Sequence, residues 1–69
     1  MPDMKQLDPY KTIIVCRVDG KEVGRKAAKS PNANAWLQEM ASHYARDGKS
    51  MTVDYEENAN AGLLAAMGL

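Results

Sequence analysis

The chain has 69 residues and no net charge at neutral pH, because nine basic side chains balance nine acidic ones. A single cysteine excludes an internal disulfide, and the roughly 20 consecutive apolar residues of a membrane-spanning helix are missing, so no membrane partner is expected. Since a chain of this length buries only about 60% of its surface, we expect one marginally stable domain. The lack of a signal-peptide pattern predicts a cytoplasmic protein.

The charges are unevenly distributed along the chain. Residues 11–29 carry six basic and two acidic side chains, a net charge of +4. Residues 30–69 carry two basic and five acidic side chains, a net charge of −3. This asymmetry favours steering toward a charged partner.

Residues 1–9 contain two of the three prolines and no regular hydrophobic pattern. We therefore expect a flexible N-terminal arm there, followed by a single small domain over residues 10–69. Residues 10–18 (YKTIIVCRV) are rich in β-branched side chains, which predicts the first strand. Both faces of this strand are apolar, as is typical of a central strand. One face holds Ile14, Cys16 and Val18, and the other holds Ile13 and Val15.

A tight β-hairpin is predicted after the first strand. Asp19 and Gly20 both tolerate positive φ, so they predict a two-residue turn into a return strand over residues 21–28. In that register Arg17 lies opposite Glu22, and we expect the two to form a cross-strand ion pair. A bulged three-residue turn would shift the pairing. Without a shift, the further pairs are Val18 with Lys21, Cys16 with Val23 and Ile14 with Arg25.

Residues 30–48 form the most regular pattern in the sequence. Apolar side chains recur three or four positions apart, which predicts one apolar face of a long helix. Ser30 and Pro31 suit its N-cap and first turn, and Gly48 suits its left-handed C-terminal position. We expect Trp36, the only tryptophan, to be a core residue whose replacement by alanine costs roughly 3–5 kcal/mol and unfolds the domain. The apolar positions are Ala33, Trp36, Leu37, Met40, Ala41 and Tyr44.

The last third of the chain predicts a strand and a short helix. Apolar and polar side chains alternate over residues 49–56, as in a strand with one buried face. Asn58 or Asn60 can cap a final helix that ends at Gly68. Apolar side chains point to more than one side of this helix, so we expect it to expose apolar surface. Leu63 and Met67 share one side, and Leu64 and Leu69 lie elsewhere.

The predicted element order is β-β-α-β-α, an α+β arrangement. A right-handed crossover through the long helix places the third strand parallel to the second, and the first strand fills the space between them. The prediction is a three-stranded antiparallel sheet in the order 2-1-3, with one long and one short helix. The second apolar face of the first strand must then be covered, and a second protein chain is one candidate.

Catalytic chemistry has little support in the sequence. His43 lies one helical turn before Asp47, a spacing that could orient an imidazole but is more typical of a solvated surface pair. Cys16 lies within an apolar strand, which favours a buried core thiol over a reactive one. The sequence contains no nucleophile elbow, phosphate-binding loop or zinc-ligand spacing. We therefore predict a protein that is not an enzyme and that holds no cofactor or metal.

The predicted hairpin gathers most of the positive charge, and a basic ribbon of this kind can follow a phosphate backbone. The paired aromatic side chains of a strand-based RNA reader are missing, however, and charged side chains on a hairpin also protect it from aggregation. Nucleic-acid binding is therefore the alternative function, and the same side chains are candidate contacts for a protein partner. They are Arg17, Lys21, Arg25, Lys26 and Lys29.

Protein binding is the function that the sequence favours. Apolar side chains on the second face of the sheet and near the C-terminus indicate surface that a partner would cover. The same surface would also serve a homodimer, which is a further alternative. The candidate apolar interface consists of Ile13, Val15, Leu64 and Leu69.

The stretch VCRVDGKEVGRKAAKSPNANA, residues 15–35, combines an Asp-Gly-Lys turn, a Val-Gly-Arg return strand and an alanine-rich helix start. It resembles the hairpin-into-helix region of some small anti-CRISPR proteins, and the chain as a whole looks like small α+β products of phages and mobile elements. The resemblance covers under a third of the chain and carries over no individual residue. It implies a stoichiometric inhibitor whose charged surface binds and modulates a host protein.

Overall fold

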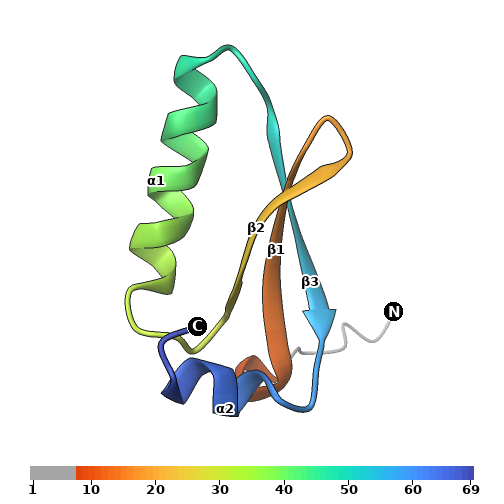
Figure 1. Cartoon of the computed structure of the whole chain (residues 1–69), viewed down its shortest axis with the longest axis vertical. Coiled ribbons are helices and arrows are strands. Elements are labelled where there is room, and N and C mark those ends of the chain that lie inside the picture. The colour runs from red at the N-terminus through yellow and green to blue at the C-terminus, as the bar shows by residue number, and fades with distance from the viewer. Residues whose placement is uncertain (1–7) are drawn as a thin grey trace, which may run out of the picture.

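The computed structural model describes residues 8–69 and has the mixed α+β architecture that the sequence predicted (Figure 1). Its elements in chain order are the 3₁₀-helix η1 (Pro9–Lys11), β1 (Thr12–Val18), β2 (Lys21–Ala27), α1 (Ala33–Arg46), β3 (Met51–Glu57) and α2 (Ala61–Ala66). The strands form an antiparallel sheet in the order β2-β1-β3. The predicted sheet order and the pair of one long and one short helix are therefore confirmed.

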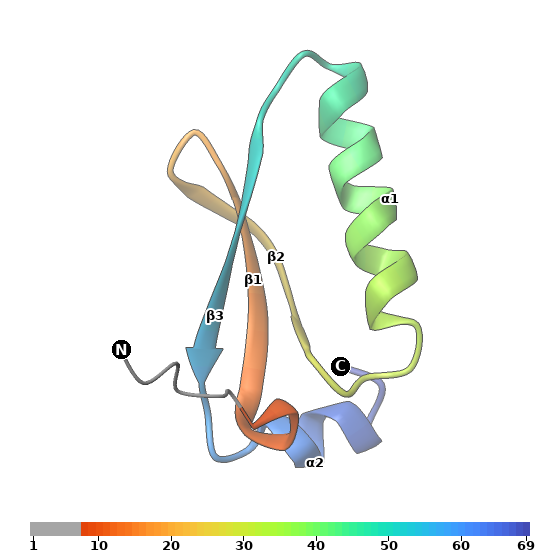
Figure 2. The same cartoon turned by 180° about the vertical axis from the view of Figure 1, so that it is seen from behind.

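The two helices pack against different clusters of core side chains. Figures 1 and 2 show α1 running alongside the strands, and α2 lying at the end of the sheet where β1 begins and β3 ends. The α1 cluster is built on Ile14 and Cys16, and the α2 cluster is built on Ile13 and Val15. Because neighbouring residues of a strand point to opposite faces, each helix covers one face of β1.

The hairpin turn has the predicted length, but the pairing beyond it is shifted. Asp19 and Gly20 have φ of 55° and 78°, as in a type I′ turn, and Arg17 lies opposite Glu22. A bulge then leaves Val23 unpaired. The predicted pairs of Cys16 with Val23 and of Ile14 with Arg25 are therefore wrong, since Cys16 pairs with Gly24, Ile14 with Lys26 and Val15 with Arg25.

The long helix begins two residues later than the sequence suggested. Its N-cap residue is Asn32, in the left-handed conformation with φ of 62°, and no side chain caps the helix. Ser30, predicted as the cap, is buried in the turn before the helix. The helix ends as expected, because Gly48 has φ of 72° and donates a hydrogen bond to the carbonyl oxygen of Ala45.

A close approach between α1 and β2 depends on Gly24. An ideal Cβ at Gly24 would lie 2.9 Å from Cε of Met40 and 3.1 Å from Cζ2 of Trp36. The missing side chain therefore lets Trp36 and Met40 lie directly on the strand backbone. Trp36 packs against the core cluster, as predicted, but remains only partly buried.

The domain includes two residues that the sequence assigned to the arm. Asp8 accepts a hydrogen bond from the N–H of Tyr10 (2.9 Å), and its carbonyl oxygen accepts one from the hydroxyl of Thr12 (2.7 Å). Pro9 begins η1. The rest of the predicted arm, residues 1–7, lies outside the described residues.

Candidate functional site

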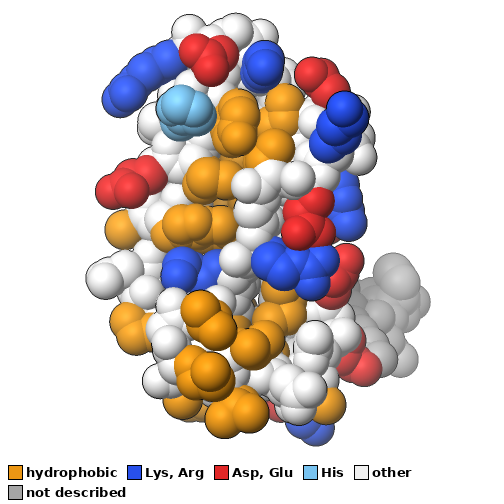
Figure 3. All heavy atoms as spheres, in the orientation of Figure 1, with side chains coloured by type: hydrophobic (Ala, Val, Ile, Leu, Met, Phe, Trp, Pro, Cys, Tyr) orange, Lys and Arg blue, Asp and Glu red, His pale blue; other side chains and the backbone are white. Residues whose placement is uncertain are grey.

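A groove between the end of β2 and the end of α2 is the best candidate for a binding site. Its volume is about 350 Å³, and most of its lining is apolar. Figure 3 shows hydrophobic side chains gathered at the α2 end of the molecule, whereas charged side chains of both signs lie over the sheet. The groove is lined by Ile13, Arg25, Lys26, Ala27, Trp36, Leu64, Gly68 and Leu69. Five of these residues were predicted to contact a partner.

The last turn of α2 shapes one wall of the groove. Gly68 has φ of 78° and donates a hydrogen bond to Ala65, and the N–H of Leu69 donates to the carbonyl oxygen of Leu64 (2.9 Å). This pattern is a Schellman motif, which turns the chain back over the helix that it terminates. Because the turn at Gly68 brings Leu69 back to Leu64, both leucines line the groove.

Two residues of β2 form hydrogen bonds with the turn that follows α2. The N–H of Ala27 donates a hydrogen bond to the carbonyl oxygen of Leu69 (3.0 Å). Nζ of Lys26 donates to the carbonyl oxygen of Gly68 (3.2 Å) and lies 6.0 Å from the ring centroid of Trp36. The aliphatic part of Lys26 thus borders apolar surface while its ammonium group stays at the rim. The groove has an apolar floor and a basic rim.

Three large apolar side chains near the C-terminal end of the sequence are exposed, and one of them, Leu69, lines the groove. Leu69 is 54% exposed, and Leu63 and Met67 are each more than 60% exposed. Leu64 is partly buried against the α2 cluster. The expectation of apolar surface near the C-terminal end of the sequence is therefore confirmed for Leu63, Met67 and Leu69.

The five predicted basic contacts do not form one surface. Arg17 and Arg25 lie on the α2 side of the sheet, since Arg17 alternates with Val15 along β1 and Arg25 is paired with Val15. Lys26 is paired with Ile14 and therefore lies on the α1 side. Lys21 is exposed at the hairpin end of β2. Nζ of Lys29 lies 5.2 Å from the ring centroid of Tyr10, beyond the strand. The single basic ribbon expected for phosphate contacts is therefore absent from the described residues.

Arg17 and Arg25 are instead part of an ion-pair network with three carboxylates. Arg17 pairs with Asp54, and its Nη2 lies 3.5 Å from Oε1 of Glu56. Arg25 donates from Nε and Nη2 to the two oxygens of Glu22, at 3.0 and 2.6 Å. Glu22 thus pairs with Arg25, and the predicted ion pair between Arg17 and Glu22 is wrong. Three carboxylates against two guanidinium groups leave this network with a formal charge of −1.

The bidentate contact between Arg25 and Glu22 shifts the pKa of both groups. The hydrogen bond from Arg25 lowers the pKa of Glu22. The same hydrogen bond raises the pKa of Arg25. Both side chains remain charged at neutral pH, so Arg25 presents a neutralised guanidinium to the groove, and Lys26 is the cation at the rim that no carboxylate in the described residues neutralises.

The predicted apolar interface is divided by the fold. Ile13 is 3% exposed and Val15 is fully buried, because α2 of the same chain packs on them. This face is covered, as expected, but by α2 and not by the second chain that was one candidate. Leu64 and Leu69 remain accessible in the groove, and only the edge of Ile13 reaches its floor.

The two side chains that the sequence analysis considered for catalysis, His43 and Cys16, lie in different environments. His43 is exposed and lies edge-on to the ring of Tyr44, with 5.0 Å between the centroids. Cys16 is fully buried, as the sequence predicted, and burial raises the pKa of its thiol. In this part of the chain, no three His, Cys, Asp or Glu side chains lie close enough together to hold a metal ion.

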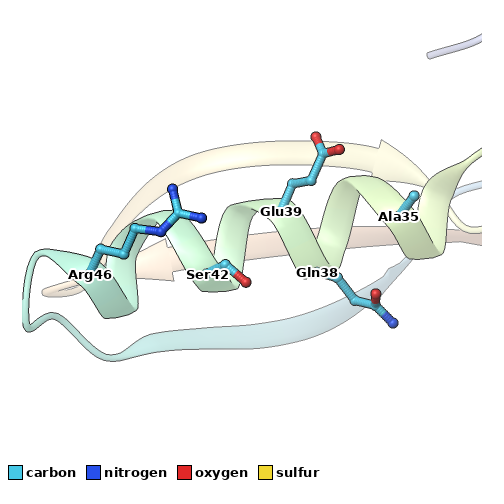
Figure 4. A pocket seen from close by; sticks show the side chains of 5 residues that line it. All are labelled: Ala35, Gln38, Glu39, Ser42 and Arg46. Atoms are coloured by element: carbon cyan, nitrogen blue, oxygen red, sulfur yellow. The ribbon is translucent and has the colours of Figure 1, made fainter.

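A second hollow lies on the outer face of α1 (Figure 4). Its volume is about 370 Å³, but all of its lining residues come from one helix. Figure 4 shows Glu39 and Gln38 pointing away from each other. Because one helix cannot enclose a ligand, this surface lacks the convergent polar groups of a small-molecule site. The lining residues are Ala35, Gln38, Glu39, Ser42 and Arg46.

Sequence reasoning missed the part of Trp36 in the groove. The helical pattern placed Trp36 on the face of α1 toward the sheet, but it did not show that the partly buried Trp36 also lines the groove. The Gly68-Leu69 pair was a usable signal, because a hydrophobic residue after a left-handed glycine commonly contacts the last turn of its helix.

A scan against protein-family models found no match, and searches of curated proteins and of solved structures also found none. Among residues 8–69, neither helix has the length and apolar character needed to cross a membrane.

Proposed function

We propose that this chain is a small, non-enzymatic binding protein that docks on another protein through the groove between β2 and α2. The observation that carries the proposal is the combination, in one groove, of apolar walls, a partly buried tryptophan and the ammonium group of Lys26. Aromatic and aliphatic anchors in a pocket with a polar rim are the usual energetic centre of a protein interface.

The chemistry of the groove indicates the kind of partner segment. An apolar side chain would fill the space between Trp36, Leu64 and Leu69. A carboxylate next to that side chain would pair with Lys26 at the rim. The partner we propose is therefore a protein that presents an exposed apolar residue beside an aspartate or glutamate.

The proposed biological setting follows the resemblance of residues 15–35 to anti-CRISPR proteins. It supports a phage or mobile-element product that binds and modulates a bacterial effector in the cytoplasm. The lone buried thiol of Cys16 is compatible with that reducing compartment. Nucleic-acid binding is the weaker alternative, because both hairpin arginines are already paired with carboxylates. A homodimer is also less favoured, since α2 covers Ile13 and Val15.

The first experiment is a pull-down with the tagged chain from bacterial lysate, with and without nuclease, followed by mass spectrometry. We expect a stoichiometric protein that survives nuclease treatment. Recovery of nucleic acid, with its accompanying proteins lost after nuclease, would contradict the proposal and favour the alternative. Titration of the purified partner should change the emission of Trp36, since this only tryptophan lines the groove.

Two variants and two matched controls locate the contact. We expect Leu69→Ser and Lys26→Glu each to weaken binding about tenfold, as loss of an interface anchor does. Leu63→Ser and Lys49→Glu change the same residue types outside the groove and should leave the affinity unchanged. If the two control variants weaken binding as much as the two groove variants, and circular dichroism shows that all four are folded, the groove is not the contact.

A further inference from the structure

The two edges of the sheet differ in how they are protected. The β2 edge contains a bulge at Val23, packs against Trp36 and Met40, and donates from Ala27 to Leu69. Met51 and Val53 of β3 also pack against the α1 cluster, but within the described residues the pairing of β3 with β1 contains no bulge and no backbone group outside the sheet bonds to the β3 edge. All seven residues of β3 pair with β1 in one continuous register. It is therefore a straight edge strand, the geometry onto which another strand most readily adds.

The backbone groups on the outer side of β3 can be identified from the ladder. The N–H of Asn58 donates to the carbonyl oxygen of Lys11 (2.7 Å), which fixes the alternation along the strand. Even-numbered residues of β3 therefore direct their backbone groups to β1, and odd-numbered residues direct theirs outward. Within residues 8–69, no backbone group bonds to the outward N–H and C=O groups of these odd-numbered residues. Those groups belong to Met51, Val53, Tyr55 and Glu57.

The side chains along this edge include two acidic residues on one face and, apart from Glu57 at its end, are apolar on the other face. Asp54 and Glu56 lie on the α2 side of the sheet, and β3 contains no basic residue. Their network with Glu22 and the two arginines keeps a formal charge of −1, as counted above. On the other face, Val53 is partly buried and Tyr55 is 54% exposed.

We infer that β3 is a docking edge for an extended segment of a partner protein that alternates basic and apolar residues. Basic side chains of the added strand would lie opposite Asp54 and Glu56, and its apolar side chains would cover Val53 and Tyr55. The backbone of the added strand would bond to the outward groups of β3, so affinity comes from main-chain hydrogen bonds and specificity from the alternation.

A second copy of this chain does not fit the same edge. Antiparallel pairing of two β3 strands about their centres would put Asp54 opposite Asp54 and Thr52 opposite Glu56. Like charges directly opposite each other destabilise a sheet. The acidic side chains therefore disfavour self-pairing while they favour a basic strand.

The test uses the full chain and a synthetic peptide that alternates lysine and valine. We expect the peptide to slow hydrogen exchange at the N–H groups of Val53, Tyr55 and Glu57, because they would become hydrogen-bonded donors. A peptide with glutamate in place of lysine should not bind. A lysine–valine peptide methylated on the valine nitrogens should bind about tenfold more weakly, since those N–H groups would face β3.

A protein variant provides an independent measurement. Tyr55→Pro removes an outward N–H that the β1–β3 ladder does not use, and proline is tolerated at such edge positions. We expect Tyr55→Pro to bind the peptide about tenfold more weakly than Tyr55→Thr, because both variants lose the tyrosine ring but only Tyr55→Thr keeps the N–H. If Tyr55→Pro does not fold, the methylated peptide still tests the proposal on the unchanged protein.

Three outcomes would overturn the inference. Unchanged exchange at the outward N–H groups would show that the acidic edge only protects the sheet from aggregation. Equal binding of the methylated and unmethylated peptides would show non-specific attraction between charges. Protection of the same N–H groups that increases with protein concentration in the absence of peptide would show that a second copy occupies the edge.

Discussion

The carbonyl oxygen of Leu69 accepts a hydrogen bond from the N–H of Ala27 (3.0 Å), which ties the turn after α2 to the edge of β2. This bond requires Gly68 to adopt φ of 78°, a conformation that glycine adopts without strain. The position of Leu69 in the groove therefore depends on one backbone angle.

Gly68→Ala tests this dependence. A Cβ at Gly68 would contact nothing within 4 Å, so the expected effect is the strain of a left-handed alanine, about 1 kcal/mol of lost stability. Because relief of that strain moves Leu69, we also expect weaker partner binding. Urea denaturation and titration of Trp36 emission measure the two effects.

Gly48→Ala is the matched control. Gly48 ends α1 with the same hydrogen-bond pattern and φ of 72°, and nothing lies within 4 Å of its Cβ position. The Gly48→Ala variant should lose a similar amount of stability but keep its affinity for the partner, because Gly48 lies outside the groove. Equal losses of affinity in both variants would contradict the proposed role of Leu69.

Trp36→Ala should destabilise the domain by about 3 kcal/mol, at the lower end of the range for aromatic core residues, because Trp36 is only partly buried. A domain of 69 residues has a total stability of only a few kcal/mol, so this loss leaves a substantial unfolded fraction. Urea denaturation followed by circular dichroism measures it. Met67→Ala, at a side chain 62% exposed, should change stability by less than about 0.5 kcal/mol.

Glu22 should make folding stability sensitive to acid. The hydrogen bond from Arg25 lowers the pKa of Glu22 in the folded protein, so its contribution is present above its unfolded pKa, about 4.3. The contribution is lost as the pH falls through the lower folded pKa. Glu22→Gln should therefore reduce the loss of stability below about pH 4. Denaturation curves at several pH values give the free energy of unfolding as a function of pH. The prediction is refuted if this free energy falls equally steeply with acid in Glu22→Gln and in the unchanged protein.

Cys16 should resist thiol reagents in the folded protein. It is fully buried, and burial raises the pKa of its thiol, so both access and thiolate formation are suppressed. We expect labelling by iodoacetamide only in parallel with global unfolding, at a rate that increases with urea. Rapid labelling of the native protein would show that the sheet opens locally around β1.

Local patterns in the sequence predicted the elements well. The type I′ turn at Asp19 and Gly20, the glycine that ends each helix and the double-sided apolar pattern of β1 each reflect the chemistry of a few adjacent residues. The start of α1 was predicted less well, because Ser30 had good capping chemistry but is buried in the preceding turn.

The candidate site was predicted only in part. The basic and apolar residues were identified by type, but their grouping was not. The bulge at Val23 shifts the pairing by one residue, and Arg25 therefore lies opposite Val15, on the face that carries Glu22 and Glu56. A bulge has no strong signal in a sequence of this kind, since it depends on how β2 accommodates the helix packed on Gly24.

The order of the three strands and two α-helices and the sheet order 2-1-3 could be predicted from the residues alone, because periodicity, turn residues and crossover handedness are local or topological properties. The 3₁₀-helix η1 was not predicted, and Tyr10 and Lys11 lie in it instead of in the first strand. The packing of the elements sets which charges neutralise each other, brings α2 over Ile13 and Val15, and places Trp36 and Leu69 in one groove. These relationships join residues up to 52 positions apart, from Ile13 to Ala65, and contacts at that separation depend on how the elements pack.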